Sequence, residues 1–242
     1  MPGVYSPEMA AEESTRFPRH QRAVFFDLDG TLTDPKPGIT RCIQHAMKEL
    51  GHAPPEADTL HWCIGPPLRG SFARLLGSSD AHLLDRALAL YRERFSVVGL
   101  FENSLYPEAP GAVSALRALG YRTFVVTSKP QVFAVRIVDH FSLSELFERV
   151  HGSELDGRRT DKGDLISHVL AQERLDPSRV VMVGDREHDA IGAARCAVRC
   201  VGVTYGYGTE SELLAQGVIR LAASPREIVG VVEAVFEKDA RG

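Results

Sequence analysis

The sequence predicts an α/β protein built on a doubly wound parallel sheet, with an all-helical domain inserted into it. Short continuous apolar runs alternate with segments of helical periodicity, as expected for parallel strands that are buried on both faces. Between about residues 38 and 95, the apolar residues instead follow helical spacing without any such run. The apolar runs lie at residues 23–26, 123–127, 180–183 and 198–203.

The chain divides into a leader, a core and an insert. Residues 1–20 mix Pro, Ser, Glu and Arg without helical or strand periodicity, which indicates a disordered leader. Residues 36–105 are expected to form the helical domain, because stretches rich in Pro and Gly, typical of hinges, bound it on both sides. The core domain then consists of residues 21–35 and 106–242.

Helices are expected between the later strands of the core. Residues 111–119 and 162–172 have helical apolar spacing, and a last helix is expected from residue 225 to about residue 236. Pro110 suits the first turn of a helix, where its missing amide proton costs nothing, and Gly120 suits the position just after the end. A helix after each strand makes the sheet parallel.

The composition argues against several classes of partner. A formal net charge of −4 over 242 residues provides no general attraction to nucleic acid or to anionic lipid. No apolar run approaches the roughly 20 residues that span a bilayer, and no apolar segment at the start is typical of a signal peptide. Four scattered cysteines are too few for a disulfide framework. We therefore expect a cytoplasmic protein without nucleic-acid or membrane partners. We also expect a monomer or a weak homodimer.

Two carboxylates follow the first expected strand. Because side chains alternate along an extended chain, Asp27 and Asp29 point toward the same side of the strand's exit. Two carboxylates in one pocket repel, so one of them holds a proton unless a divalent cation relieves the repulsion. A nucleophile and an acid can therefore coexist there. An isolated Asp-x-Asp is equally an ordinary acidic turn, but Asp-Leu-Asp-Gly-Thr after Val-Phe-Phe is more specific.

Groups that can bind phosphate are expected at two other positions. Thr127 and Ser128 end the second core strand, where a hydroxyl and nearby amide protons can bind phosphate oxygens. Lys162 stands at the start of a helix, where its cation neutralises phosphate and the helix terminus adds amide donors. Each of these is, on its own, equally compatible with a surface position.

Two further carboxylates, Asp185 and Asp189, follow the apolar run 180–183. Carboxylates at the end of a buried strand favour a hard cation with oxygen ligands. Mg²⁺ typically keeps several waters and takes one or two protein carboxylates together with substrate phosphate. Asp27 and Asp185, with Asp189 behind them, fit this pattern.

Together these motifs resemble those of the haloacid-dehalogenase (HAD) superfamily of phosphatases. The resemblance covers about residues 23–236 and implies a Rossmann-like core with an inserted helical cap domain. In the order of the superfamily, the motifs are Asp-Leu-Asp-Gly-Thr from Asp27, Thr127 or Ser128, Lys162, and Gly184-Asp185 with Asp189.

The resemblance implies a magnesium-dependent phosphomonoester hydrolase. Asp27 would attack phosphorus to form an aspartyl phosphate, while Asp29 protonates the leaving oxygen and later activates water. The metal would contact Asp27, the backbone carbonyl of Asp29, and Asp185, with Asp189 supporting the site. The phosphoryl group would be held by Thr127 or Ser128 and by Lys162.

The insert resembles the cap of the phosphoglycolate phosphatase-like branch, which closes over the active site. The segments that begin at Gly65, Gly99 and Gly184 look most like proteins labelled 5'-nucleotidase or phosphoglycolate phosphatase. The implied substrate is a small phosphorylated metabolite: a nucleoside 5'-monophosphate, phosphoglycolate or a dedicated biosynthetic intermediate. Arg69, which follows Gly-Pro-Pro-Leu in the cap, is a candidate contact to that substrate, and a solvated helix charge is the alternative.

Other functions share parts of this pattern. A phosphomutase of the same superfamily uses the same aspartyl phosphate and passes the phosphoryl group to a sugar, and no core motif excludes it. A phosphorylatable, receiver-like binding module has a similar sheet but needs no helical insert. A dehalogenase is disfavoured because Asp29 supplies the acid that phosphate chemistry needs.

Overall fold

The computed structural model describes residues 19–238. Its elements begin with the 3-10 turn η2 (Arg19–Gln21) and end with helix α9 (Ile228–Lys238). The expected leader, residues 1–20, therefore lies outside the described residues except for its last two residues, which belong to η2.

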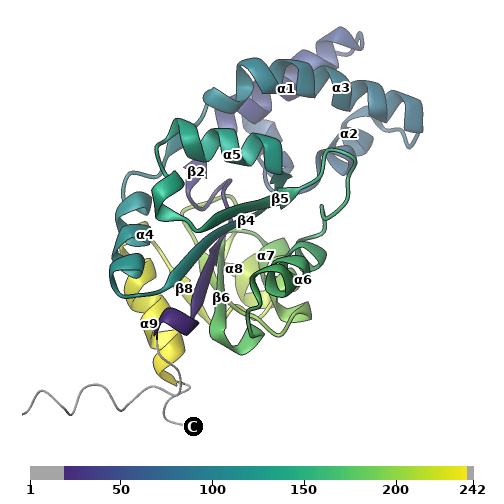
Figure 1. Ribbon diagram of the computed structural model, residues 1–242. Coiled ribbons are helices and arrows are strands. Elements are labelled where there is room, and N and C mark those ends of the chain that lie inside the picture. The colour runs from purple at the N-terminus through teal and green to yellow at the C-terminus, as the bar shows by residue number, and fades with distance from the viewer. Residues whose placement is uncertain (1–18, 239–242) are drawn as a thin grey trace, which may run out of the picture.

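The core is a six-stranded sheet in which all neighbouring strands run parallel (Figure 1). The strand order is β5-β4-β1-β6-β7-β8, so the chain starts near the centre and winds outward in both directions. The predicted fold class is thus confirmed. The strands are β1 (Ala23–Phe26), β4 (Arg122–Pro130), β5 (Arg149–Ser153), β6 (Val180–Gly184), β7 (Arg199–Val203) and β8 (Arg220–Ala222).

The apolar runs of the sequence do not predict the two edge strands, β5 and β8. β5 reads Arg-Val-His-Gly-Ser and β8 reads Arg-Leu-Ala, and neither contains the continuous apolar run of the central strands. An edge strand has a neighbour on one side only, so polar residues are tolerated there and even protect the edge.

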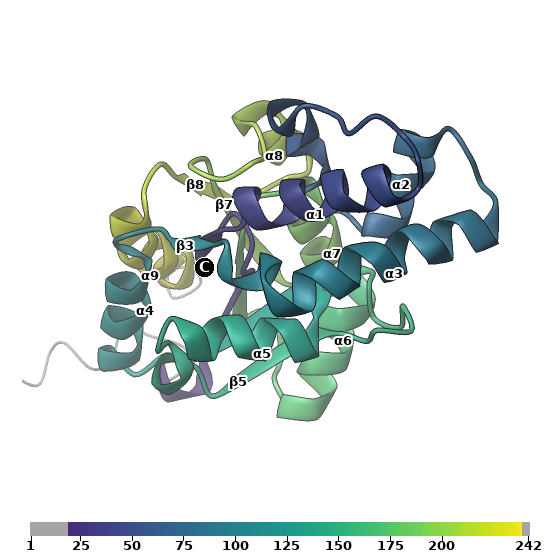
Figure 2. The same ribbon diagram turned by 90° about the horizontal axis from the view of Figure 1, so that it is seen from above.

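Helices cover both faces of the sheet (Figures 1 and 2). The side chains of β1 alternate, so that Val24 and Phe26 join the apolar cluster on one face while Ala23 and Phe25 join the cluster on the other. Three helices pack on the first face: α4 (Ala109–Ala118), α5 (Gln131–His140) and α9. The other face carries α6 (Lys162–Glu173), α7 (Glu187–Arg195) and α8 (Glu210–Ala215).

Between β2 (Thr33–Asp34) and β3 (Ser104–Leu105) the chain forms helices only, and we call this segment the insert. β2 and β3 pair antiparallel, which places the outgoing and returning chains side by side. The apolar cluster on the first face of the sheet continues into the insert, so the two share one core. The insert comprises α1 (Lys36–Glu49), η3 (Ala57–Cys63), α2 (Leu68–Leu76), α3 (Ala81–Val97) and η4 (Gly99–Phe101).

Two glycines allow a close approach at the base of the insert. A Cβ atom at Gly38 would lie 2.0 Å from the carbonyl oxygen of Gly99, and one at Gly99 would lie 2.4 Å from the Sγ of Cys42. Any side chain at either position would push η4 away from α1.

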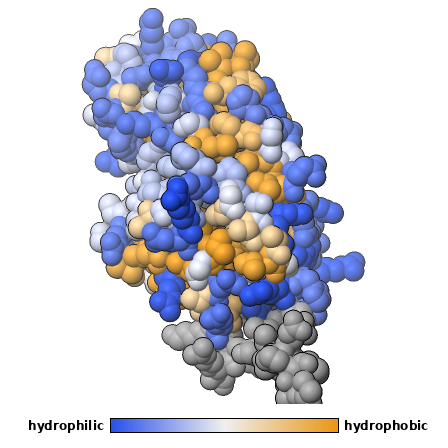
Figure 3. All heavy atoms as spheres, turned by 90° about the vertical axis from the view of Figure 1, so that its left-hand side faces the viewer, coloured by the Kyte–Doolittle hydropathy of each residue, from blue (hydrophilic) through white to orange (hydrophobic). Residues whose placement is uncertain are grey.

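The surface shown in Figure 3 mixes hydrophilic and apolar residues, with an apolar band that runs from the insert toward the core. Exposed apolar side chains of the protein include Val97 and Phe101 at the end of the insert and Val132 on α5. None of the helices within residues 19–238 combines the length and the apolar composition needed to cross a lipid bilayer.

Candidate active site

The carboxyl ends of three strands converge at one edge of the sheet. β1 lies between β4 and β6, and Phe26 is in register with Val125 on one side and with Val183 on the other. Because parallel strands end at the same edge, the residues that follow these three positions lie together. The motifs recognised in the sequence occupy this edge.

Three buried carboxylates form a cluster there. Asp27, Asp185 and Asp189 each place one carboxylate oxygen within 4.8 Å of the others, and their exposed fractions are 5%, 0% and 1%. Burial and then repulsion from the other two carboxylates raise the pKa of Asp185 well above its usual value. Burial also raises the pKa of Asp189, although Lys162 opposes this rise.

Lys162 supplies a cation inside the cluster. Its Nζ lies 2.8 Å from Oδ1 of Asp27 and 2.8 Å from Oδ1 of Asp189. Burial alone would lower the pKa of Lys162, but the attraction of these two carboxylates outweighs burial and raises it. The Asp161 side chain caps α6 by accepting a hydrogen bond from the amide of Asp164 at 2.9 Å. Helix α6 therefore begins at Lys162, as the sequence predicts.

The cluster fits a divalent cation. Asp27, Asp185 and Asp189 carry three negative charges when ionised, and Lys162 neutralises one of them, which leaves two. Oδ2 of Asp185 accepts a hydrogen bond from the amide of Tyr207 at 2.7 Å. Its buried Oδ1 has no hydrogen-bond partner within residues 19–238. Carboxylate oxygens with this net charge are ligands that Mg²⁺ prefers.

Glycines pack directly against Asp185. A Cβ atom at Gly30, where φ is +85°, would lie 2.1 Å from Oδ2 of Asp185, and one at Gly206 would lie 2.4 Å from the Cβ of Asp185. The sequence identifies Gly30 through its motif, but the loop that contains Gly206 and Tyr207 carries no such signal. Sequence reasoning therefore misses the loop whose backbone holds Asp185.

Asp29 pairs with a different lysine. Nζ of Lys129 lies 2.8 Å from Oδ2 of Asp29, and both side chains are largely buried. Burial raises the pKa of Asp29, while Lys129 opposes the rise. Oδ1 of Asp29 has no hydrogen-bond partner among the described residues. Lys129 is absent from the residues that sequence reasoning selects, because nothing in its position before Pro130 indicates that it reaches Asp29.

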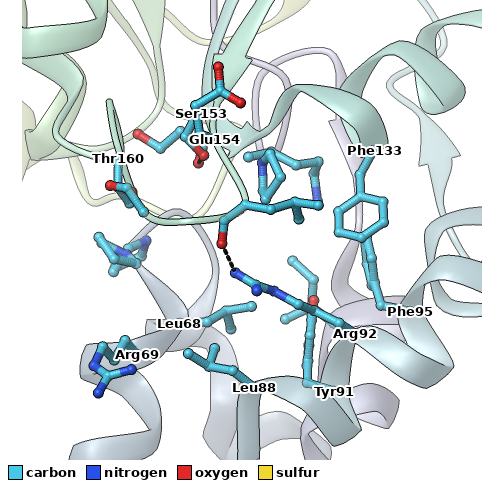
Figure 4. Close-up of a pocket in the computed structure, with 18 of the residues that line it drawn as sticks. Leu68, Arg69, Leu88, Tyr91, Arg92, Phe95, Phe133, Ser153, Glu154 and Thr160 are labelled. Carbon is cyan, nitrogen blue, oxygen red and sulfur yellow. Dashed lines mark hydrogen bonds between the residues drawn. The ribbon is translucent and has the colours of Figure 1, made fainter. Parts of the chain in front are cut away.

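Two cavities meet beside Asp29. The smaller one has a volume of about 20 Å³, and the larger one, of about 560 Å³, lies between the insert and the core (Figure 4). The smaller cavity is lined by Asp27, Thr127, Lys162, Arg186, His188 and Asp189. Four residues line both cavities: Asp29, Gly65, Ser128 and Lys129.

The larger cavity has mostly apolar walls. Leu68 of α2 and Leu88 of α3 lie on the side of the insert, and Figure 4 shows both pointing into the cavity. The rings of Tyr91, Phe95 and Phe133 complete the wall, with the first two stacked at a centroid distance of 5.2 Å. Lys129 lies over the ring of Phe95, with its Nζ 4.6 Å from the ring centroid.

Arg69 lies on the rim of the larger cavity and does not line the smaller one. It forms an ion pair with Asp85 of α3, and its side chain is 46% exposed. The structure thus brings the predicted core residues together but places Arg69, with a counter-ion already in place, away from the smaller cavity.

Arg186 joins the core to the insert beside the smaller cavity. Its Nη1 donates a hydrogen bond to the carbonyl oxygen of Ile64 at 2.7 Å, and its Nε donates one to Glu212 at 2.9 Å. A Cβ atom at Gly65 would lie 3.1 Å from the Cγ of Arg186. The segment after Gly184 is therefore also a contact between the two parts of the molecule, which its sequence does not reveal.

Comparisons with known proteins agree on the family. The sequence model of the haloacid dehalogenase-like hydrolase family matches residues 24–203. A 5'-nucleotidase of Pseudomonas aeruginosa is 47% identical over 192 residues, which are 79% of this chain and 86% of that protein. A phosphoglycolate phosphatase of Nitrosospira multiformis is 31% identical over 197 residues, again 79% of this chain and 86% of that protein.

Two further similarities extend this picture. Tyrosine-protein kinase PtkA of Mycobacterium tuberculosis is 40% identical over 185 residues, which are 76% of this chain and 62% of the kinase. The crystal structure of a predicted phosphatase from Clostridium acetobutylicum superimposes with a TM-score of 0.85 at 34% identity. That similarity covers 88% of this chain and 99% of the other.

Proposed function

Because the chain belongs to the haloacid dehalogenase-like hydrolase family and is a phosphatase of small phosphorylated substrates, we propose a more specific function. The proposed function is that of a magnesium-dependent phosphomonoester hydrolase that forms an aspartyl phosphate on Asp27. One observation carries the proposal. Asp27 lines the smaller cavity beside Lys162, while a second carboxyl group, that of Asp29, stands where this cavity meets the larger one. The two carboxyl groups therefore have different surroundings, so that one can act as the nucleophile and the other as the acid.

Asp27 is the proposed nucleophile. One of its carboxylate oxygens attacks phosphorus while the bond between phosphorus and the ester oxygen breaks, so the phosphoryl group moves to Asp27. Lys162, whose Nζ lies 2.8 Å from Oδ1 of Asp27, holds the carboxylate in place. A water molecule then attacks the phosphorus, releases inorganic phosphate and restores the carboxylate.

Asp29 is the proposed general acid and base. Burial raises the pKa of Asp29, which helps this group to carry the proton that it gives to the leaving oxygen as the ester bond breaks. The resulting carboxylate takes a proton from the attacking water in the second step. Its position between the two cavities is the one that this double task requires, because the leaving group departs into the larger cavity.

The remaining core residues bind the metal and the phosphoryl group. Asp27, Asp185 and the backbone carbonyl of Asp29 would hold magnesium, with Asp189 behind them, since these carboxylates carry the excess negative charge described above. When bound, the ion neutralises charge on the phosphoryl oxygens. The phosphoryl group itself would be held by Thr127, Ser128 and Lys162, which line the smaller cavity.

The size of the larger cavity favours a leaving group with a ring. Pockets of roughly 300–1,000 Å³ typically hold ligands of the size of a drug molecule, and this cavity has a volume of about 560 Å³. A nucleoside 5'-monophosphate, suggested by the name of the P. aeruginosa relative, would fill much of it. Phosphoglycolate, suggested by the N. multiformis relative, would leave most of it empty, while a dedicated biosynthetic intermediate with a ring fits equally.

Two alternatives differ from this proposal in the fate of the phosphoryl group. A phosphomutase would pass it from Asp27 to a sugar, and a receiver-like module would keep it on Asp27. Because this chain spans 62% of the M. tuberculosis kinase, we propose no kinase activity.

The experiment that tests the proposal measures phosphate release from nucleoside 5'-monophosphates, phosphoglycolate and sugar phosphates, with magnesium or with EDTA. We expect magnesium-dependent release that Asp27→Asn abolishes, and acid quenching of the wild type during turnover should trap a phosphoryl group on Asp27. Isomerised sugar phosphate without free phosphate would instead identify a mutase. A folded, magnesium-loaded wild type that releases phosphate from no substrate, generic aryl phosphates included, would overturn the proposal.

A further inference from the structure

We propose that Arg92 is a specificity-determining residue, which binds a carbonyl or carboxylate oxygen on the leaving group of the substrate. This inference rests on the proposed function, because it takes the larger cavity as the place that receives the leaving group. It adds to that function a chemical requirement on the substrate: a leaving group that carries a carbonyl or carboxylate oxygen.

Arg92 differs in one respect from the other charged side chains on the larger cavity. It forms no ion pair with any carboxylate in the described part of the chain, whereas each of the others has a partner of opposite charge. The paired side chains are Arg69 with Asp85, Lys129 with Asp29, Glu154 with Arg159, and Asp156 with Arg158.

The guanidinium of Arg92 reaches into the cavity. Figure 4 shows it extending from α3 toward the loop on the opposite side, where its Nη2 donates a hydrogen bond to the carbonyl oxygen of Leu155 at 2.9 Å. The side chain of Arg92 is only partly exposed. A guanidinium has five N–H donors, so most of its capacity remains for a molecule inside the cavity.

The partner of Arg92 belongs to the leaving group and not to the phosphoryl group. Arg92 lines the larger cavity but not the smaller one, where Asp27 and Lys162 lie. A partly buried cation without a counter-ion gains free energy from an acceptor that meets it there. The carbonyl of Leu155 shows the kind of acceptor that the position takes. The apolar walls beside it, including Leu68 and Leu88, suit the rest of a ring.

A purely structural role for Arg92 makes a different prediction. Its hydrogen bond to Leu155 also joins the insert to the loop after β5. If that link were the whole contribution of Arg92, its loss would lower kcat/KM for every substrate to the same extent. Selective loss on substrates with an acceptor separates recognition from this structural role.

The test compares Arg92→Met with Arg86→Met on matched substrates. Arg86 lies on the same helix, is exposed, and does not line the larger cavity, so it controls for the loss of a charge from α3. The short pair of substrates is phenyl phosphate and its para-carboxylate. The longer pair is ribose 5-phosphate and uridine 5'-monophosphate, whose base carries carbonyl groups. Each variant is compared with the wild type on one substrate at a time, so differences in leaving-group acidity cancel.

We expect Arg92→Met to lower kcat/KM by about 10-fold to 100-fold on the acceptor-bearing member of at least one pair, the size of a lost charged hydrogen bond. On the member without a carbonyl or carboxylate group, the change in kcat/KM should stay within about 2-fold. Loss on the para-carboxylate alone would identify an organic acid as the leaving group, and loss on the nucleotide alone would identify a base carbonyl. Arg92→Lys, which keeps a cation, should restore part of the preference.

Two results would overturn the inference while leaving the proposed function intact. One is an equal loss on both members of each pair, and the other is no change in Arg92→Met on any substrate that the wild type hydrolyses. If the folded wild type releases phosphate from none of the four, the proposed function itself fails. Thermal unfolding of each variant, with a melting temperature within about 2 °C of the wild type, shows that the comparison concerns folded protein.

Discussion

The core edge and the insert differ in how deeply their charged side chains are buried. At the core edge, charged groups are buried and paired at short distance, as Lys162 is with Asp27 and Asp189. On the insert, charged side chains are only partly buried: Arg69 pairs with Asp85 at the rim of the larger cavity, and Arg92 reaches into that cavity. A buried charge cannot be removed without a large loss of stability, whereas a partly exposed charge can. The comparison agrees with our proposal that residues of the sheet carry out the reaction while residues of the insert select the substrate.

The largest effect is expected from Lys162→Met, which removes the cation from the carboxylate cluster. Three carboxylates would then remain buried with no lysine beside them. Breaking a buried ion pair from one side typically costs about 3–5 kcal/mol of the free energy of unfolding, and we expect activity to fall below detection. Chemical denaturation with and without magnesium measures the change, and magnesium should stabilise this variant more than the wild type.

Lys48→Met is the matched control, because Lys48 is an exposed residue of α1 in the insert. It should leave both the stability and the activity within about 0.5 kcal/mol and 2-fold of the wild type. If the two lysine variants lost the same stability, the contrast between the core edge and the insert would be wrong.

Asp29→Asn should have the next largest effect on the rate, and it should also lower the stability because it leaves the buried Lys129 without its carboxylate partner. Without a proton to give, the variant should lose about 10²-fold to 10⁴-fold in kcat on alkyl phosphates. With p-nitrophenyl phosphate, whose leaving group needs no proton, the first step should survive and the second should slow. Stopped-flow measurement should then show a burst of nitrophenol of about one equivalent. If the variant lost activity on alkyl phosphates and on p-nitrophenyl phosphate to the same extent, this role of Asp29 would be wrong.

The core edge could be predicted from the sequence because its residues follow from strand periodicity. Asp27, Asp185 and Lys162 each stand directly after a buried strand or at a helix start, and register carries them to one edge. Lys129 is not predicted as a site residue in this way, although its side chain is also buried. Its pairing with Asp29 depends on how the irregular end of β4 bends, where the register with β5 shifts after Thr127.

Leu88→Ala should change the choice of substrate without changing the chemistry. Leu88 points into the larger cavity from α3, so truncation removes apolar contact with a bulky leaving group and enlarges the cavity. We expect kcat/KM for the preferred ring-containing substrate to fall at least about 10-fold, because even one methylene group in an apolar pocket is worth about that much. A small substrate such as glycerol phosphate should be hydrolysed at the wild-type rate.

Leu83→Ala on the same helix tests whether lost packing explains the result, because Leu83 does not line the cavity. It should leave the ratio of the two substrates unchanged. If Leu83→Ala shifted the ratio as much as Leu88→Ala, the insert would act through its stability and not through its cavity wall.

The insert could not be predicted at the same level of detail. Helical spacing identifies that helices form there, but it does not say which residues face a cavity formed with distant parts of the chain. Arg69 and Arg92 are both arginines on amphipathic helices, and the sequence favoured Arg69 because of its Gly-Pro neighbours. Only the packing of α3 against the loop after β5 shows that Arg92 points inward while Arg69 pairs with Asp85.

The smallest effect is therefore expected from Arg69→Met, the residue of the insert that the sequence singled out. Its partner Asp85 is also exposed, and an exposed ion pair contributes roughly 0.5 kcal/mol or less to stability. With its charge already neutralised, Arg69 has little attraction left for a substrate, so kcat/KM should stay within about 2-fold of the wild type. Asp85→Asn provides the complementary measurement, because it frees the arginine and should improve KM for anionic leaving groups if Arg69 can reach them. A large loss in Arg69→Met, matching that of Arg92→Met, would place both arginines in the recognition of the leaving group.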